Sequence, residues 1–334
     1  MRRWIAGWMT ICLGLGVAQA VQLPEAPLFV QMTHADGLPS TYVNALEEDA
    51  AGYLWVATQD GLARYDGVEF TIYRHAVDDA TTLPGNAVQV LHVDAQDRIW
   101  VGAEGGGISM LDVDRRAFRR YSPEADSRIA LRDVWTIASQ DDGVVWFGGY
   151  DGGLYRLDTQ ADAVQVFRAG DQDEGGLPSD HILDLLPMPD GRLFVATSAG
   201  LVILRDGVFE AAPPFHHPRP GMVLSLFAAP DASVWVGTQS GVERLAEGRF
   251  VPVFEDEAAQ ALVASGVPRI IADRNGGYWL GTRSGLRYAH EGKVRDATAY
   301  AALGGVELVL DMLEDHEGGL WFALRNVGLI RLQP

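Results

Sequence analysis

Polar and aromatic side chains recur at two kinds of position in this sequence of 334 residues. Tight, Gly-containing turns between apolar runs supply Gln59, Asp60, Glu104, Tyr150, Gln239, Arg283 and Arg325. The starts of other apolar runs supply Tyr42, Asp133, Trp135, Asp180, His181 and Arg269. Carboxylates, amides, guanidinium groups and aromatic rings together bind polar solutes such as sugars, by hydrogen bonding and ring stacking. These residues are our candidate ligand site, and a solvated surface without a ligand is the alternative.

Catalysis would need a general base among these groups, and usually a metal. None of the turns carries a His, and the apolar runs offer only His181, at a start, and His92, near a far end. We therefore expect no enzyme activity, no catalytic residue, no metal and no cofactor. The adjacent His216 and His217 are expected to lie in a solvated loop, because neighbouring histidines alone rarely bind a metal.

A sevenfold repeat determines where the candidate residues lie. Each copy has an apolar run around an aromatic residue, then a turn with Gly, then a second apolar run. The aromatic anchors are Trp55, Trp100, Trp146, Phe194, Trp235, Trp279 and Trp321, which are 41 to 48 residues apart. A period of about 40–50 residues with several short strands is typical of a β-propeller blade. We predict an all-β, seven-bladed β-propeller over residues 27–334, with four antiparallel strands per blade and buried anchors. Alternating strand directions would then bring the candidate turns and the starts of the inner strands to the same rim.

The two ends of the propeller each have an incomplete set of strands. Residues 27–32 read as a strand without a blade, whereas the seventh repeat stops at Leu332 after three strands. We predict that this N-terminal strand is the outer strand of blade seven, so that the ring closes without an open edge. The Ala-rich stretches 256–265 and 298–303 are predicted to be short helices between blades.

Carboxylates recur six residues before four of the anchors, at Asp49, Asp94, Asp273 and Asp315. Each begins a turn, where an Asp side chain accepts hydrogen bonds from the backbone that follows. We therefore predict turn capping here rather than metal sites. Arg115, Arg116, Arg119 and Arg120 read as a basic spot of unpaired charges at a blade edge.

Charge and the N-terminus limit the partners and the compartment. The formal charge of −19 disfavours nucleic acid and anionic lipid, which basic patches attract. Residues 1–20 read as a signal peptide cleaved after Ala20, with Arg2 and Arg3 before an apolar run; an uncleaved anchor is the weaker alternative because the run is short. We expect a periplasmic protein, a flexible lead-in at residues 21–26 and no further membrane span.

The first repeat resembles the two-component regulator propeller family. The resemblance rests on Gly37-Leu38-Pro39-Ser40, Asp49, Gly52, Leu54-Trp55-Val56-Ala57-Thr58, Gly61-Leu62 and Tyr65-Asp66-Gly67. It implies the extracytoplasmic sensor region of a histidine kinase, hybrid kinase or diguanylate cyclase, which detects oligosaccharides or other small solutes. The sequence up to Pro334 contains no such output module, so we expect either a stand-alone relative or a fragment of a larger receptor.

Three functions follow as hypotheses. The first is a non-catalytic module that binds a small polar solute or a periplasmic protein for signal transduction. The second is a lyase of the streptogramin lyase type, which belongs to exported propellers with similar repeats. The third is a scaffold for envelope proteins.

Overall fold

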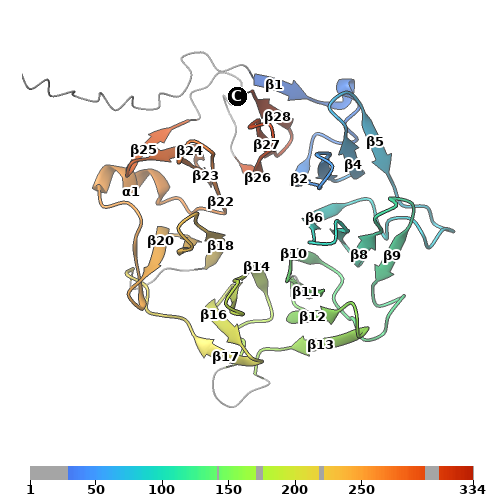
Figure 1. Ribbon diagram of the computed structural model, residues 1–334, viewed down its shortest axis with the longest axis horizontal. Coiled ribbons are helices and arrows are strands. Elements are labelled where there is room, and N and C mark those ends of the chain that lie inside the picture. The colour runs from blue at the N-terminus through green and yellow to red at the C-terminus, as the bar shows by residue number, and fades with distance from the viewer. Residues whose placement is uncertain (1–28, 141–142, 171–175, 218–221, 298–307, 334) are drawn as a thin grey trace, which may run out of the picture.

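The computed structural model describes residues 29–140, 143–170, 176–217, 222–297 and 308–333. Within these ranges, 28 strands form seven four-stranded antiparallel sheets. Figure 1 shows the sheets arranged as blades around a central axis. The predicted seven-bladed β-propeller is therefore confirmed.

Each blade is built from four strands that follow one another outward from the axis. The inner strands are β2 (Val43–Glu48), β6 (Val88–Val93), β10 (Val134–Ser139), β14 (Ile182–Pro187), β18 (Val223–Ala228), β22 (Arg269–Ala272) and β26 (Val309–Glu314). The second strands are β3 (Leu54–Thr58), β7 (Ile99–Ala103), β11 (Val144–Gly149), β15 (Leu193–Thr197), β19 (Val234–Thr238), β23 (Tyr278–Thr282) and β27 (Leu320–Leu324). The third strands are β4 (Gly61–Tyr65), β8 (Gly107–Leu111), β12 (Leu154–Asp158), β16 (Gly200–Arg205), β20 (Gly241–Ala246), β24 (Gly285–His290) and β28 (Gly328–Leu332). The outer strands are β5 (Phe70–Tyr73), β9 (Phe118–Tyr121), β13 (Ala163–Phe167), β17 (Val208–Ala211), β21 (Arg249–Pro252), β25 (Lys293–Asp296) and β1 (Phe29–Met32).

The ring closes between the two ends of the described chain. Strand β1 pairs antiparallel with β28, with Phe29 opposite Leu332 and Met32 opposite Leu329. Figure 1 shows β1 beside β28 as the outer strand of blade seven. The predicted closure is confirmed for residues 29–32, while residues 27 and 28 lie outside the described part of the chain.

The aromatic anchors form the cores between the blades, as predicted. All seven are buried, with no more than 7% of any anchor exposed. Close approach near the axis requires Gly at several second-strand positions. For example, a Cβ atom on Gly102 would lie 2.6 Å from Val90, and one on Gly148 would lie 2.6 Å from Ile182 of the next blade. A larger residue at either position would force the second strand away from the inner strand that it contacts.

A β-bulge near the start of six of the seven inner strands positions the residues that face the axis. The pairing with the second strand shifts register between Val134 and Thr136 of β10, and at the same place in β2, β6, β14, β18 and β26. A bulge leaves one residue unpaired and re-aims its side chain. In β10 this residue is Trp135, which lies half-exposed at the axis.

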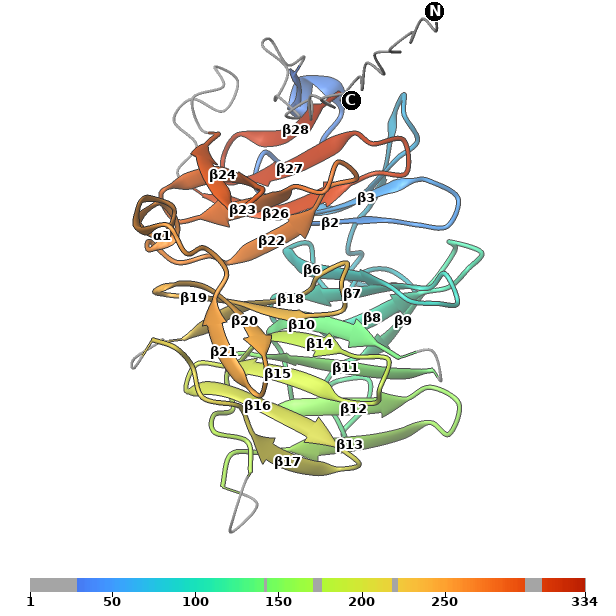
Figure 2. The same ribbon diagram turned by 60° about the vertical axis from the view of Figure 1, so that its left-hand side comes forward.

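Within the described residues, two short helices accompany the blades: the 3₁₀ helix η1 (His34–Asp36) and α1 (Glu257–Val263). Helix α1 confirms the helix predicted within residues 256–265. It begins after Asp256, whose side chain accepts a hydrogen bond from the N–H of Ala259, and it packs against β20 and β25. Figure 2 shows α1 beside blades five and six. The second predicted helix, the signal peptide and the lead-in lie outside the described residues. No described helix has the length and apolar character needed to cross a membrane.

Candidate functional site

The hairpins between second and third strands lie beside the starts of the inner strands, and we call this face the hairpin rim. In six blades a backbone N–H at the hairpin bonds the carbonyl of the residue just before the inner strand, and in blade six the acceptor lies three residues before the strand. Examples are Gln59 to Tyr42, Tyr150 to Asp133 and Arg325 to Leu308. The two groups of candidate residues predicted from the sequence therefore share one face.

A cavity of about 330 Å³ lies on the axis between the inner strands. Aliphatic residues contribute to its wall, but polar atoms make up most of the surface that faces it, and its polar and aromatic lining consists of Glu47, Trp135, Thr136, Asp184, Arg269 and Asp311. Five blades contribute these six residues. Sequence reasoning found Trp135 and Arg269 but missed Glu47, Asp184 and Asp311, whose signal was a charged residue within an otherwise apolar inner strand.

Arg269 and Asp311 form an ion pair in this cavity. Arg269 Nε lies 2.9 Å from Asp311 Oδ1. The other oxygen of Asp311 accepts a hydrogen bond of 2.9 Å from the N–H of Leu46 in the next blade. Burial raises the pKa of Asp311 even though Arg269 and the backbone donors oppose the shift. Asp311 therefore joins blades seven and one and compensates the guanidinium charge.

Asp184 repeats this arrangement between blades four and five. Its Oδ2 accepts a hydrogen bond of 2.7 Å from the N–H of Leu226, and its Oδ1 accepts one of 2.9 Å from the N–H of Leu185. Burial raises its pKa, and the charge of Arg269 opposes that shift. Both aspartates thus hold adjacent inner strands together at the axis.

Glu47 differs from both aspartates, because its carboxyl group makes no hydrogen bond with any described residue. Its side chain is 32% exposed and lines the cavity. The Nδ1 of His92 lies 3.9 Å from the Glu47 carboxyl group. Burial and the charge of Asp311 raise the pKa of Glu47 to about 8, and Arg269 lowers it only in part. Glu47 is therefore mostly protonated at neutral pH.

His92 does not supply a compensating charge to Glu47. Its Nε2 forms a hydrogen bond of 2.7 Å with the hydroxyl of Ser139 in the next blade. Burial lowers the pKa of His92 to about 4. The imidazole is therefore neutral near pH 7, and it cannot hold Glu47 in its ionised form.

Three aromatic candidates meet on the hairpin rim. Trp135 and Tyr150 are 42% and 53% exposed, and their ring centroids are 5.6 Å apart. The ring of His181 from the next blade lies 4.4 Å from the ring of Tyr150. Because Trp135 also lines the axial cavity, this aromatic series leads from the hairpin rim to the cavity mouth.

The remaining candidates have separate partners on the same face. Arg325 lies over the ring of Tyr42 at 5.0 Å, and Glu104 accepts a hydrogen bond from Gln89. Asp133 and Asp180 each accept a backbone N–H bond of 2.8 Å, from Gly105 and Ala169 respectively, so they stabilise loops. Asp60 forms an ion pair with Arg74. Gln59, Gln239 and Arg283 bond the inner-strand starts through their backbone N–H groups.

Comparison with known proteins bears on the first repeat and on the fold. A family model described as two component regulator propeller matches residues 37–60. Residues 37–60 form a two-component regulator propeller repeat. A curated histidine kinase P4 from Formosa agariphila is 43% identical over 56 residues, which are 17% of this chain and 4% of that protein. The resemblance predicted from the sequence is thus confirmed at this repeat.

Solved structures with this fold include extracellular domains and an enzyme. The extracellular domain of a protein assigned as a hybrid two component system in B. thetaiotaomicron is 20% identical, with a TM-score of 0.76 over 92% of this chain and 42% of that one. A catalytically inactive virginiamycin B lyase from Staphylococcus aureus, solved with quinupristin, is 12% identical, with a TM-score of 0.67 over 92% and 99% of the two chains. At these identities the likeness shows the fold alone. This chain covers about two fifths of the B. thetaiotaomicron chain.

In the regulator propeller repeat, the Asp before the anchor caps the following turn, as predicted. Asp49 Oδ1 accepts hydrogen bonds from the N–H groups of Ala51 and Tyr53. Sequence reasoning missed the second oxygen, which accepts a bond of 2.9 Å from the indole N–H of the anchor Trp55. Asp94 and Asp315 bond their own anchors in the same way, at 2.7 Å each. We call the face with these turns, opposite the hairpin rim, the turn face.

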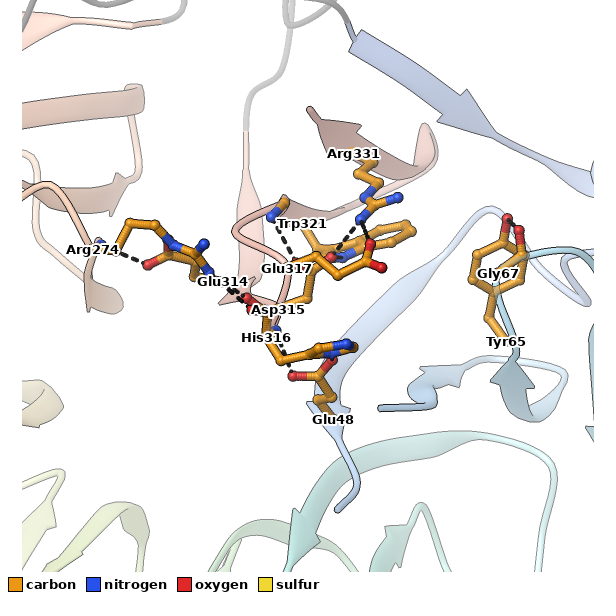
Figure 3. Close-up of polar contacts among 11 residues, drawn as sticks. Glu48, Tyr65, Gly67, Arg274, Glu314, Asp315, His316, Glu317, Trp321 and Arg331 are labelled. Carbon is orange, nitrogen blue, oxygen red and sulfur yellow. Dashed lines mark hydrogen bonds and ion pairs between the residues drawn. The ribbon is translucent and has the colours of Figure 1, made fainter. Parts of the chain in front are cut away.

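The turn face carries dense ionic contacts where blades six, seven and one meet. Figure 3 shows Asp315 between Trp321 and Arg331, with Arg331 also bonding Glu317. On Asp315, burial raises the pKa, but the indole, the N–H of Gly319 and Arg331 outweigh it, so that its pKa falls below the ordinary value. A pocket of about 270 Å³ lies beside this network.

Two carboxylates link neighbouring blades across this part of the turn face. Glu48 of blade one accepts hydrogen bonds from the backbone N–H and the Nδ1 of His316, and Glu314 accepts the corresponding pair from Arg274 (Figure 3). Each acid ends an inner strand, and each donor lies in the preceding blade's turn. The network therefore stabilises the interfaces of blade seven with blades six and one.

The predicted basic spot of unpaired arginines is wrong for three of its members. Arg115 pairs with Asp49 and Asp97, and Arg119 pairs with Asp162. Arg120 donates to backbone carbonyls of the preceding inter-blade loop. The blade edge faces acidic turns, which the sequence order did not reveal.

The described residues contain no cluster of three His, Cys, Asp or Glu side chains suited to a metal. The backbone N–H groups of His216 and His217 bond the buried carboxylate of Glu243, so this loop is anchored to β20.

Proposed function

We propose that this chain is the ligand-sensing region of a signalling protein of the two-component type. It works outside the cytoplasm after export, and it binds a small polar solute, such as an oligosaccharide, at the hairpin rim without converting it. A histidine kinase or diguanylate cyclase module receives the signal. The curated histidine kinase and the extracellular sensor domain with the same fold support this assignment.

The observation that carries the proposal is the exposed aromatic series at the cavity mouth. Large aromatic side chains are normally buried, and here seven anchors are, yet Trp135 and Tyr150 stand half-exposed beside a cavity. Exposed rings offer flat apolar surfaces for stacking, and the surrounding carboxylates and guanidinium groups offer hydrogen bonds. Trp135, Tyr150 and His181 are thus the central residues of the proposed site.

A thermal-shift screen of oligosaccharides and amino acids against residues 21–334 tests the proposal. A ligand at 100 times its Kd stabilises a protein by about 2.7 kcal/mol, which gives a shift of several degrees. We expect Trp135→Ala to abolish the shift from the active solute. Val68→Ala, which alters an exposed apolar residue on the turn face, is the matched control. A shift that persists in Trp135→Ala would place the ligand elsewhere and contradict the proposed site.

A lyase activity is the second candidate, because the propeller aligns with 99% of the Staphylococcus aureus lyase. His181 is the imidazole on the hairpin rim that such chemistry would use. Incubation with quinupristin, with and without divalent cations, measures this activity directly. If quinupristin is opened by the wild type but not by His181→Ala, the lyase function replaces the sensor proposal. If quinupristin stays intact, the sensor proposal is supported. Capture of one stoichiometric envelope protein without solute binding would favour a scaffold instead.

A further inference from the structure

The axial cavity holds one carboxyl group that the fold does not use. Asp184 and Asp311 bond the backbone of neighbouring blades, and Arg269 is paired with Asp311. Glu47 accepts no such bond from the described residues, and its side chain lines the cavity. A partly buried carboxyl group without donors lowers stability. Its placement is therefore explained better by a role in binding than by the architecture.

The distance between Glu47 and the aromatic series sets the length of that ligand. Trp135 is the second residue of its inner strand, whereas Glu47 is the fifth of β2. Inner strands stand in matching register, because the third residue Asp311 bonds the N–H of the fourth residue Leu46 in the next blade. A difference of three residues corresponds to about 10 Å along the axis. A ligand that contacts both ends must be elongated.

The charges around the cavity select the sign of the ligand. Asp311 compensates Arg269, which leaves Asp184 and Glu47 as potential anions in the cavity. The formal charge of the whole chain, −19, attracts cations over a longer range. At the mouth, the face of Trp135 binds ammonium groups and the methylene groups next to them. The site therefore suits an organic cation and disfavours an anion.

We propose that the cavity binds a linear aliphatic diamine or polyamine, with one ammonium group at Glu47 and the methylene chain extended along the axis past Trp135. The proposal rests on the sensor function proposed above and names the class of its ligand. The ring of Trp135 offers the methylene chain an apolar surface, and the carboxylates offer acceptors to its ammonium groups.

Binding is then coupled to the release of a proton. The groups that face Glu47 are Asp311 of β26, Arg269 of β22 and His92 of β6, with Asp184 of β14 acting through Arg269. The pKa of Glu47, raised to about 8 by burial, leaves it protonated at neutral pH, so it must lose its proton to hold an ammonium ion. His92 stays neutral, because its pKa is about 4. Affinity should therefore increase from pH 6 to pH 8.

Titration calorimetry with two probes of equal length tests this inference on the folded chain. We expect 1,8-diaminooctane to bind once per chain and 1,8-octanediol, its neutral counterpart, not to bind. Measurements at pH 7 in two buffers of different ionisation enthalpy should show that the diamine releases up to one proton. No diamine binding to the folded protein, or equal binding of the diol, would overturn the inference.

Three variants locate the probe. Glu47→Gln should weaken diamine binding about tenfold or more and abolish proton release. Trp135→Ala should weaken it roughly fivefold and preserve proton release. Glu210→Gln removes the same charge from the exposed outer strand β17 and should change neither quantity. Equal affinities for Glu47→Gln and Glu210→Gln would show a surface counterion effect and overturn the inference.

The outcome also separates this inference from the sensor function. If the diamine does not bind but another solute does, and Trp135→Ala abolishes that binding, the sensor function stands and the amine is wrong. If neither the diamine nor any screened solute binds, both proposals fail.

Discussion

Asp315 on the turn face and Glu47 on the axis differ in the hydrogen-bond donors around their carboxyl groups. On the turn face, Asp315 accepts bonds from an indole, a backbone N–H and Arg331, and its pKa lies below the ordinary value. On the axis, Glu47 accepts none from the described residues, and its pKa rises to about 8. The donors around each carboxyl group therefore separate an acid that stabilises the fold from one that is left for a ligand.

The largest expected effect comes from removing a satisfied acid. Asp315→Ala leaves the indole of Trp321 without an acceptor and removes a partner of Arg331, so we expect unfolding to become easier by about 3–5 kcal/mol. Urea denaturation measures this change. Asp79→Ala removes an exposed turn-capping acid and should cost much less. Equal losses in the two variants would show that the turn-face network is unimportant.

The second effect concerns Glu47 and pH. Glu47 ionises near its ordinary pKa of 4.5 in the unfolded chain but near 8 in the folded protein. The folded state therefore holds the extra proton between these values, and stability falls as the pH rises through this window. Between pH 5 and pH 8.5, the free energy of unfolding of the wild type should fall by about 2 kcal/mol more than that of Glu47→Gln. This figure is smaller than the full pKa shift implies, because solvent screens a partly exposed carboxyl group.

Urea unfolding at both pH values checks this expectation. The two-point comparison between wild type and Glu47→Gln cancels the titration of groups that both proteins share. Parallel pH profiles would show that Glu47 ionises normally, and the contrast with Asp315 would then disappear.

A natural variation of the turn provides a smaller effect. In blade three, Gln140 replaces the Asp, and its Oε1 accepts the indole N–H of Trp146 at 3.1 Å. This bond lacks a negative charge, so Gln140→Ala should cost about 1 kcal/mol. Thermal and urea unfolding, compared with Asp315→Ala, measure the contribution of the charge. A cost as large as that of Asp315→Ala would assign the stabilisation to the indole bond alone.

The smallest effect lies at the exposed pair of His316 and Glu48. The hydrogen bond and charge of Glu48 raise the pKa of His316. The pair of His316 and Glu48 therefore stabilises the folded state fully below the ordinary His pKa of 6.5. This stabilisation is lost as the pH rises through the higher pKa of His316 in the folded protein. Melting temperatures of wild type and Glu48→Gln should differ at pH 5.5 and converge at high pH. A difference that does not change with pH would contradict this assignment.

Much of the architecture was predictable because each blade repeats the same local pattern. Anchor spacing predicted seven blades, and the unmatched strand at residues 27–32 predicted the closure, which the structure shows for residues 29–32. Turn capping by Asp49 followed from local backbone chemistry, since donor and acceptor lie within four residues. The shared rim also followed, because alternating strand directions bring the hairpins and the inner-strand starts to one face.

The sequence by itself thus determined the number of blades, their strand order, the burial of the anchors and the face that carries the candidate residues. Only the tertiary structure decided that Glu47, Arg269 and Asp311 share a cavity and that Trp135 is exposed at its mouth. The physical reason is that a periodic pattern specifies equivalent positions but not the residues opposite them across the axis. Those residues come from blades one, three, six and seven, so their charges meet only when the ring is closed.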